Sequence, residues 1–255
     1  MSKKARMSVL SALSAGAALL GAAPAYAANF SIDPVVASLS PHAPSTLLDM
    51  GNTAAATLRF ELSGFVWSQG PAGQIVLTPT DDMIFFPQLF ALNAGEKRKV
   101  RIGTVAPAED TEKSYRLMVA QMPSLAGERP AGSGVELLTQ LSIPVFVEPA
   151  VVRKDADLSG VTATGRMISF QIVNTGNVHL VVEKATITGL NATGTPAFSR
   201  QAKEWYVLAG KSSNYSLELT ADECAKAQTI EVTVNTETKA FDQRVAGSPG
   251  SCAAR

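Results

Sequence analysis

The sequence predicts an all-β protein built from two antiparallel sandwiches joined by a short hinge. Short runs rich in Val, Ile, Thr and aromatic residues recur along the chain, with turns rich in Gly, Pro and Asn between them. No convincing amphipathic helical pattern interrupts these runs. After Glu148 and Pro149 the strand pattern starts again, which indicates a second unit of the same class.

The N-terminus has the three parts of a secretory signal. Lys3, Lys4 and Arg6 form a basic start, an apolar run follows over residues 7–23, and Ala25-Tyr26-Ala27 is a small-x-small cleavage pattern. A membrane anchor is the alternative, but the run is short and ends in a cleavage motif. We expect residues 1–27 to be removed on export and no later segment to insert in a membrane.

The chain has no net charge, since 22 Lys and Arg balance 22 Asp and Glu. A balanced chain has no overall field that would attract nucleic acid or an anionic membrane. We therefore expect neither of these as a partner.

The first unit is predicted to span residues 28–148. Its strands are expected over residues 57–67, 74–78, 99–102, 115–121 and 135–147. Turn residues separate these strands at 68–73, 93–95 and 123–134.

The second unit is predicted to span residues 149–255. Its strands are expected over residues 168–172, 178–182, 204–208, 215–219 and 229–235. In the last of these, the alternation places Ile230, Val232 and Val234 on one face, as in a half-buried strand.

The two cysteines, Cys224 and Cys252, both lie near the C-terminus. In an exported protein such a pair predicts one disulfide, which adds about 3 kcal/mol of stability. Redox chemistry is the alternative, but the Cys-x-x-Cys spacing is absent.

No set of residues predicts catalysis. The two histidines, His42 and His179, fall in different units, so neither a metal cluster nor a Ser/His/Asp arrangement can be assembled, and a structural role is expected for His179. Asp81 and Asp82 are adjacent, and adjacent residues on an extended chain point to opposite faces. We expect no enzyme activity, no cofactor and no metal site.

The strongest charge run is residues 97–101, Lys-Arg-Lys-Val-Arg. In a strand, Lys97, Lys99 and Arg101 share one face. This face is either a solvated sheet surface or a docking surface for an acidic partner.

The strand over residues 135–147 is the most informative segment. One face of it carries Val135, Leu137, Thr139, Leu141 and Ile143. A long apolar strand is an aggregation hazard unless it has a use, because an unpaired strand edge templates pairing with other chains. The preceding loop, residues 123–134, is rich in Gly and Pro, and we expect it to be mobile until a partner orders it.

Several segments together resemble the PapD-like periplasmic pilus chaperones of the chaperone–usher pathway. Residues 85–95 resemble the family's Pro, apolar, Leu, Gly turn; residues 114–123 resemble its Tyr-Arg-Leu strand that ends in Pro; and residues 137–149 resemble its exit into the second domain. In the second unit, residues 174–179 and 205–210 also look like features of these chaperones. The resemblance covers nearly the whole chain after the signal.

The resemblance implies two immunoglobulin-like domains and a location in the periplasm. It also implies a function: binding and folding pilus subunits by donor-strand complementation, and delivering them to an outer-membrane usher. The alternative is an exported structural surface protein, a pilus subunit or a two-domain adhesin. The internal position of the donor-like strand favours the chaperone, and it stays open whether the free protein forms a self-capping dimer.

The chain departs from the family at the residues that hold the subunit's terminal carboxylate. The resemblance leads us to expect basic residues there, but the matching positions are Val36 and Pro144. We expect Arg116 to take this role, rather than Lys113, because arginine can hold a carboxylate through two parallel hydrogen bonds. The alternatives are that Arg116 is only a surface residue of its strand, or that capture works differently.

Overall fold

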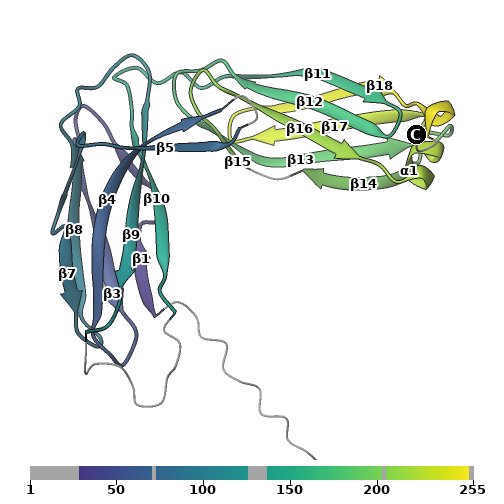
Figure 1. Cartoon of the computed structure of the whole chain (residues 1–255). Helices are drawn as coiled ribbons and strands as arrows, with labels where there is room; N and C mark the ends of the chain where they lie inside the picture. Colours follow the sequence, from purple (N-terminus) through teal and green to yellow (C-terminus); the bar gives the residue numbers. More distant parts are fainter. Residues whose placement is uncertain (1–28, 71–72, 126–136, 203–204, 253–255) are drawn as a thin grey trace, which may run out of the picture.

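The structure is a computed structural model that describes residues 29–70, 73–125, 137–202 and 205–252. The predicted signal segment and residues 126–134 of the predicted mobile loop lie outside these ranges. Two β-sandwiches meet at a corner and give the molecule the shape of an L (Figure 1). The all-β class with two sandwich domains is therefore confirmed. Within the described residues, no helix is long and apolar enough to cross a membrane.

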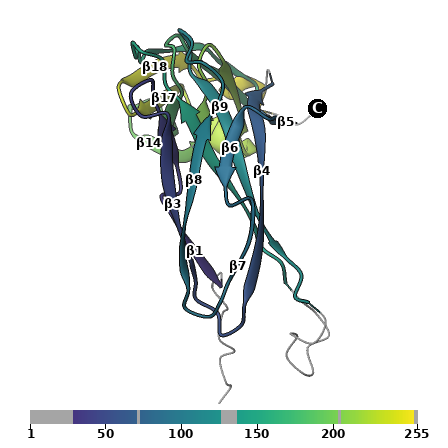
Figure 2. The ribbon, with the colours of Figure 1, turned by 90° about the vertical axis from the view of Figure 1, so that its left-hand side faces the viewer.

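The first sandwich consists of two sheets that face each other. One sheet has the order β1 (Phe30–Asp33), β3 (Ser45–Asn52), β8 (Lys97–Thr104), β6 (Met83–Phe86). The other has the order β2 (Ala37–Leu39), β10 (Gln140–Val147), β9 (Lys113–Met122), β4 (Leu58–Gln69), β5 (Ile75–Pro79), and β7 (Leu89–Leu92) also pairs with β4. Figure 2 shows β3, β8 and β6 side by side, with the second sandwich behind their upper end.

Alternation along the strands builds the core of this sandwich. On β4 the inward residues Phe60 and Leu62 are fully buried, and on β9 the inward residues Leu117 and Val119 are too. The residues between them face outward on the same strands, as the period of two requires. The outward face of β4 and β9 therefore remains available for a function outside the core.

The second sandwich also has two sheets. One has the order β11 (Ala156–Thr164), β12 (Met167–Asn174), β16 (Ser212–Glu218). The other has the order β14 (Pro196–Ala202), β13 (Leu180–Leu190), β17 (Thr229–Thr236), β18 (Ala240–Ala246), and β15 (Trp205–Val207) also pairs with β13. The predicted boundary at residue 148 lies in the connection between β10 and β11, and its exact position stays a prediction.

Two short helical segments near the C-terminus were not expected from the sequence. Helix α1 (Ala221–Lys226) begins with a capping box between Thr220 and Glu223, and a 3₁₀ turn follows at Pro249–Ser251. Six residues are too few to show helical periodicity, so only the capping residues could have indicated this helix from the sequence. Cys224 of α1 forms the predicted disulfide with Cys252, with the two Cα atoms 5.6 Å apart.

Both sandwiches use one buried asparagine in the same way. The amide of Asn52 donates to the carbonyls of Ala56 and Leu92, at 2.8 and 2.9 Å. The amide of Asn174 donates to the carbonyls of Val178 and Val207, at the same two distances. Each asparagine ends a strand and satisfies carbonyls that the sheet leaves unpaired, so the two domains are built on a common local plan.

Candidate functional site

Strand β10 has an open edge. On one side it pairs with β9 along its whole length, from Gln140 opposite Ala120 to Val147 opposite Lys113. On its other side β2 pairs with it in parallel, but only over residues 145–147. Among the described strands, none covers this side of residues 140–144, which we call the open edge. Its backbone groups can pair with a strand from another chain.

The open edge lies on the inner side of the corner between the two sandwiches (Figure 1). Pro144 is the last residue before β2 begins to pair, and proline is tolerated here because an edge does not need its N–H. A strand added to this edge must therefore stop at Pro144, where β2 already occupies the position.

The predicted donor-strand residues do not all lie in the same environment. Val135 is outside the described residues, Leu137 is 84% exposed and Leu141 is 36% exposed. Thr139 is half-buried, and its carbonyl accepts a hydrogen bond from Gln121 of β9. Ile143 is only 3% exposed, because it packs in the core of its own sandwich. Leu137 and Leu141 are thus available to a partner, whereas Ile143 holds β10 in place.

Arg116 lies directly opposite Pro144, on the outward face of β9. Its side chain is almost completely buried, so it is not an ordinary surface residue of a strand. The guanidinium stacks on Trp67 of β4, with Cζ 3.7 Å from the ring centroid. Its Nη1 donates a long hydrogen bond of 3.5 Å to the carbonyl of Ser142, and Nε and Nη2 have no partner among the described residues.

The burial of Arg116 has an electrostatic consequence. Burial lowers the pKa of the guanidinium below its usual value, and the nearby Tyr206 acts in the opposite direction. An arginine still keeps its charge at neutral pH. A buried cation with two unpaired donors is costly unless an anion joins it, and a carboxylate is an anion that such donors can hold.

The other basic candidate on β9 already has a partner. Lys113 forms an ion pair with Glu109, with 2.7 Å between Nζ and Oε1. The structure also places Val36 next to the open edge: it immediately precedes Ala37, which pairs with Val145. Arg116 is therefore the cation beside the end of the open edge, while Val36 and Pro144 supply apolar surface there.

An apolar cluster lies between the two sandwiches and adjoins Arg116. Trp67 and Phe146 of the first sandwich and Leu208 of the second are buried in it, and Tyr206 packs against them. The rings of Trp67 and Phe146 are 5.9 Å apart, and those of Trp67 and Tyr206 are 5.6 Å apart. The second sandwich thus helps to build the wall of the arginine site.

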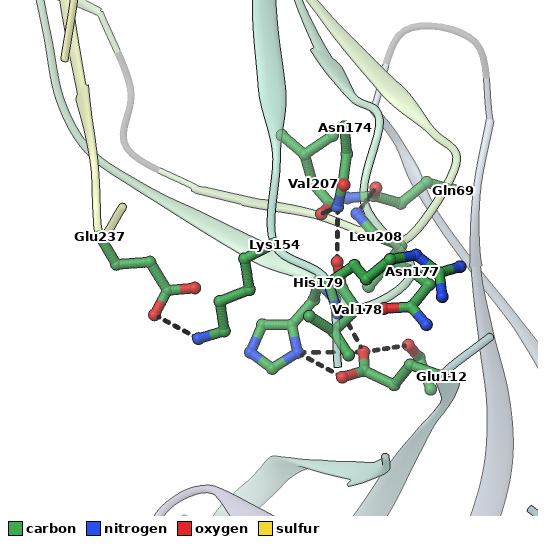
Figure 3. A network of polar contacts seen from close by, with 12 residues as sticks. Gln69, Glu112, Lys154, Asn174, Asn177, Val178, His179, Val207, Leu208 and Glu237 are labelled. Carbon is green, nitrogen blue, oxygen red and sulfur yellow. Dashed lines mark hydrogen bonds and ion pairs between the residues drawn. The ribbon is translucent and has the colours of Figure 1, made fainter. Parts of the chain in front are cut away.

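A buried contact between a carboxylate and an imidazole crosses the same interface (Figure 3). Glu112 of the first sandwich has a fully buried side chain, and its two oxygens lie 3.0 and 2.9 Å from Nδ1 of His179. The backbone N–H of His179 also donates to Glu112, at 3.1 Å. The imidazole stacks on Phe146 of β10, with centroids 3.6 Å apart. His179 therefore has the structural role expected from the sequence.

Two buried amides add hydrogen bonds across the corner. Gln69 donates to the carbonyl of Tyr206 at 2.7 Å and accepts from the N–H of Leu208 at 2.8 Å. Asn177 donates to the carbonyls of Asp110 and Val151, at 2.7 and 2.8 Å. Sequence reasoning missed Gln69, which is a single polar residue at the end of a strand and gives no signal of a remote partner.

Two of the four basic residues in the run on β8 form ion pairs with acidic neighbours. Lys99 forms an exposed ion pair with Asp49 at 2.7 Å, and Arg98 forms one with Glu96 at 2.8 Å. Arg101 donates to the hydroxyl of Ser45. These contacts favour the solvated-surface interpretation. Within the described residues, no group of three or more His, Cys, Asp or Glu side chains could hold a metal ion.

Part of the sequence matches a known protein family. Residues 65–153 match the family model "Pili and flagellar-assembly chaperone, PapD N-terminal domain". No curated protein matches the sequence. The matched segment contains Arg116, β10 and the connection to the second sandwich.

Solved structures share the fold of both sandwiches. A chain of the CsuC–CsuE chaperone–tip adhesion subunit pre-assembly complex, from archaic chaperone-usher Csu pili of Acinetobacter baumannii, is 19% identical with a TM-score of 0.57, covering 85% of this chain and 98% of that one. The E. coli chaperone DraB is 15% identical with a TM-score of 0.55 and the same coverage. A chain of the Salmonella enterica complex of the SafA pilin with the SafB chaperone is 13% identical with a TM-score of 0.53, covering 85% and 96%.

These identities are low, and the likeness shows a shared fold over both domains. The chain is therefore similar to the PapD-like pilus chaperones, in sequence over residues 65–153 and in fold over both sandwiches.

Proposed function

We propose that the chain is a periplasmic chaperone that binds pilin or adhesin subunits during chaperone–usher pilus assembly. It lends the open edge of β10 to an incomplete subunit and then passes the subunit to an outer-membrane usher. Two of the similar structures are described as complexes of a chaperone with a tip adhesion subunit or with a pilin, which supports this class of partner.

The observation that carries the proposal is the open edge that ends beside a buried, unpaired arginine. An added strand gains main-chain hydrogen bonds along residues 140–144, and its side chains alternate between the two faces of the sheet. Because β2 begins to pair at Val145, the added strand ends at Pro144. A chain terminus placed there lies next to Arg116, the register partner of Pro144.

Arg116 then anchors the terminal carboxylate of the subunit. The carboxylate can pair with Nε and Nη2, the two donors that have no partner among the described residues. Both atoms are covered in the free protein, so capture requires a small movement of the surrounding side chains, for which Tyr206 of the second sandwich is a candidate. Formation of the ion pair offsets the cost of keeping the guanidinium buried.

Apolar side chains of β10 add to the affinity. Burying a fully exposed leucine contributes about 1.5 to 3 kcal/mol. Because Leu137 is 84% exposed and Leu141 only 36%, the two together contribute roughly 2 to 4 kcal/mol before the cost of ordering both partners. Val135, which lies outside the described residues, is proposed to extend this set. No external energy source is needed for binding of this size.

Co-expression tests the proposal. The full chain is expressed with small exported β-proteins encoded beside its gene, and one-to-one complexes are purified from the periplasm. We expect a complex with the wild type and with Arg98→Ala, which removes a surface arginine of the other sheet, but none with Arg116→Ala. Circular dichroism of purified Arg116→Ala should show an intact fold. An undiminished yield of complex with Arg116→Ala would reject the anchor.

A further inference from the structure

The end of the open edge carries a second feature besides Arg116. Val35 is 69% exposed and Val36 is 36% exposed, and both lie where the chain bends into β2. In-register pairing of Ala37 with Val145 places Val36 beside Pro144. Two exposed valines therefore lie in line with the open edge, at the point where an added strand must stop.

We infer that Val35 and Val36 form an apolar seat for the side chain of the subunit's last residue, and so select subunits that end in an uncharged, apolar residue. This inference rests on the proposed function. The occupant is the C-terminal residue of the added strand: its carboxylate pairs with Arg116, and its side chain packs on the valines. Arg116 and Pro144 are register partners on neighbouring strands about 5 Å apart, and Val36 directly precedes Ala37, which pairs with Val145, so a single residue at the stop point lies near all three.

The chemistry of the seat favours an apolar side chain over a charged one. The side chains of Val35, Val36 and Pro144 at the stop point are apolar, and the cation beside them is taken up by the terminal carboxylate. A charged terminal side chain would lose its water against this surface without gaining a partner. A terminal lysine would in addition place a second cation near the guanidinium of Arg116.

Peptide binding to the full exported chain tests the inference. The probes are three fluorescein-labelled peptides of alternating threonine and valine that end in leucine with a free carboxylate, in leucine amide, or in lysine with a free carboxylate. We expect fluorescence anisotropy to show about four- to twelvefold weaker binding for the lysine peptide, the change that corresponds to half of a leucine side chain's transfer free energy.

Variants of the seat give the matched comparison. Val36→Asp should remove the preference for leucine and favour the lysine peptide, whereas Val105→Asp, at an exposed valine after β8 in the opposite sheet, should leave the preference unchanged. Equal binding of the leucine and lysine peptides with free carboxylates, or a preference unaffected by Val36→Asp, would contradict the inference that Val35 and Val36 form an apolar seat.

The amide peptide separates this inference from the proposed anchor. Weaker binding of the amide than of the acid supports the carboxylate anchor, whatever the result for the seat. Equal binding of leucine acid and leucine amide would reject the anchor, and with it the inference. Absence of binding by all three peptides would reject strand addition at β10, and the inference of an apolar seat would be rejected as well.

Discussion

At the scale of single residues, the candidate site depends on one poorly satisfied cation. Arg116 has the position, the burial and the free donors for a carboxylate, but in the free protein it lacks an anion. Such a residue lowers the stability of the free protein, because a buried charge without a counter-charge is costly. The sequence pointed to Arg116 through its Tyr-Arg-Leu segment, but the stacking on Trp67 could not be predicted, because those residues lie 49 positions apart, at 67 and 116.

Arg116→Met should raise the free energy of unfolding by about 1 kcal/mol while abolishing subunit capture. Methionine keeps contact with Trp67 and removes the unpaired charge, and such replacements of buried charges are often stabilising. Urea unfolding of the two proteins measures the difference. A loss of stability greater than about 1 kcal/mol would show that the guanidinium has a structural role instead.

Tyr115 should make the stability fall at alkaline pH. Burial, followed by the negative charge of Asp82, raises the pKa of its hydroxyl from 10.0 to about 12. The hydroxyl donates to Asp82 at 3.1 Å, which favours the protonated form. Between these two pH values the folded chain keeps a proton that the unfolded chain has released, so this contribution is complete below pH 10 and is lost as pH rises through about 12.

Urea unfolding at a series of pH values tests this prediction. The wild type should lose more stability than Tyr115→Phe as the pH rises above 10.0. Parallel curves for the two proteins would show that Tyr115 is not the group responsible.

At the scale of elements, β10 combines two functions along its length. Its last three residues complete the first sandwich, with β9 on one side and β2 on the other, whereas residues 140–144 pair on one side only. Leu141 and Ile143 lie on the same face but differ in exposure by a factor of about ten. The alternation could be predicted from the sequence, but the point at which the strand enters its own core depends on β2, which the sequence did not reveal.

Leu141→Asp and Ile143→Ala should therefore change different properties of the protein, subunit binding in the first and stability in the second. Leu141→Asp should fold normally and lose subunit binding, because it places a charge on the exposed part of the strand. Ile143→Ala should lower the free energy of unfolding by about 2 to 5 kcal/mol, because it leaves a cavity in the core. Thermal unfolding combined with periplasmic recovery of complexes separates the two. Equal loss of stability in both variants would contradict this division.

Most strands with clear alternation could be predicted, and two of the missed strands lie at sheet edges. The expected strands over residues 168–172 and 229–235 are confirmed as parts of β12 and β17, each with one buried face. Strands β14 and β18 were missed because they lie at sheet edges, where most side chains are exposed and no apolar alternation is required.

At the scale of the whole molecule, polar contacts hold the corner between the sandwiches. The contact of Glu112 with His179 and the amides of Gln69 and Asn177 connect the two domains. Since Phe146 of β10 stacks on His179, the corner also fixes the strand that is proposed to bind subunits. Neither half of the sequence predicts this corner alone, because each contact joins residues of different domains.

His179→Ala should lower the free energy of unfolding by about 1 to 3 kcal/mol, since it removes the imidazole partner of the fully buried carboxylate of Glu112 and leaves the backbone N–H of residue 179 and the Ser114 hydroxyl as its donors. The double variant Glu112→Gln/His179→Ala should recover part of this loss, because it removes the charge itself. Chemical unfolding of both variants gives the comparison. A double variant less stable than His179→Ala would contradict the explanation.

Hydrogen–deuterium exchange of the chain with and without a bound subunit tests strand addition at β10 most directly. Subunit binding should slow exchange strongly over residues 140–143, where the backbone of the open edge acquires a partner, and should change residues 145–147 little, because β2 already pairs with them. Slower exchange at β8 or in the second sandwich, with residues 140–143 unchanged, would show that the subunit binds elsewhere and that β10 is not the strand it uses.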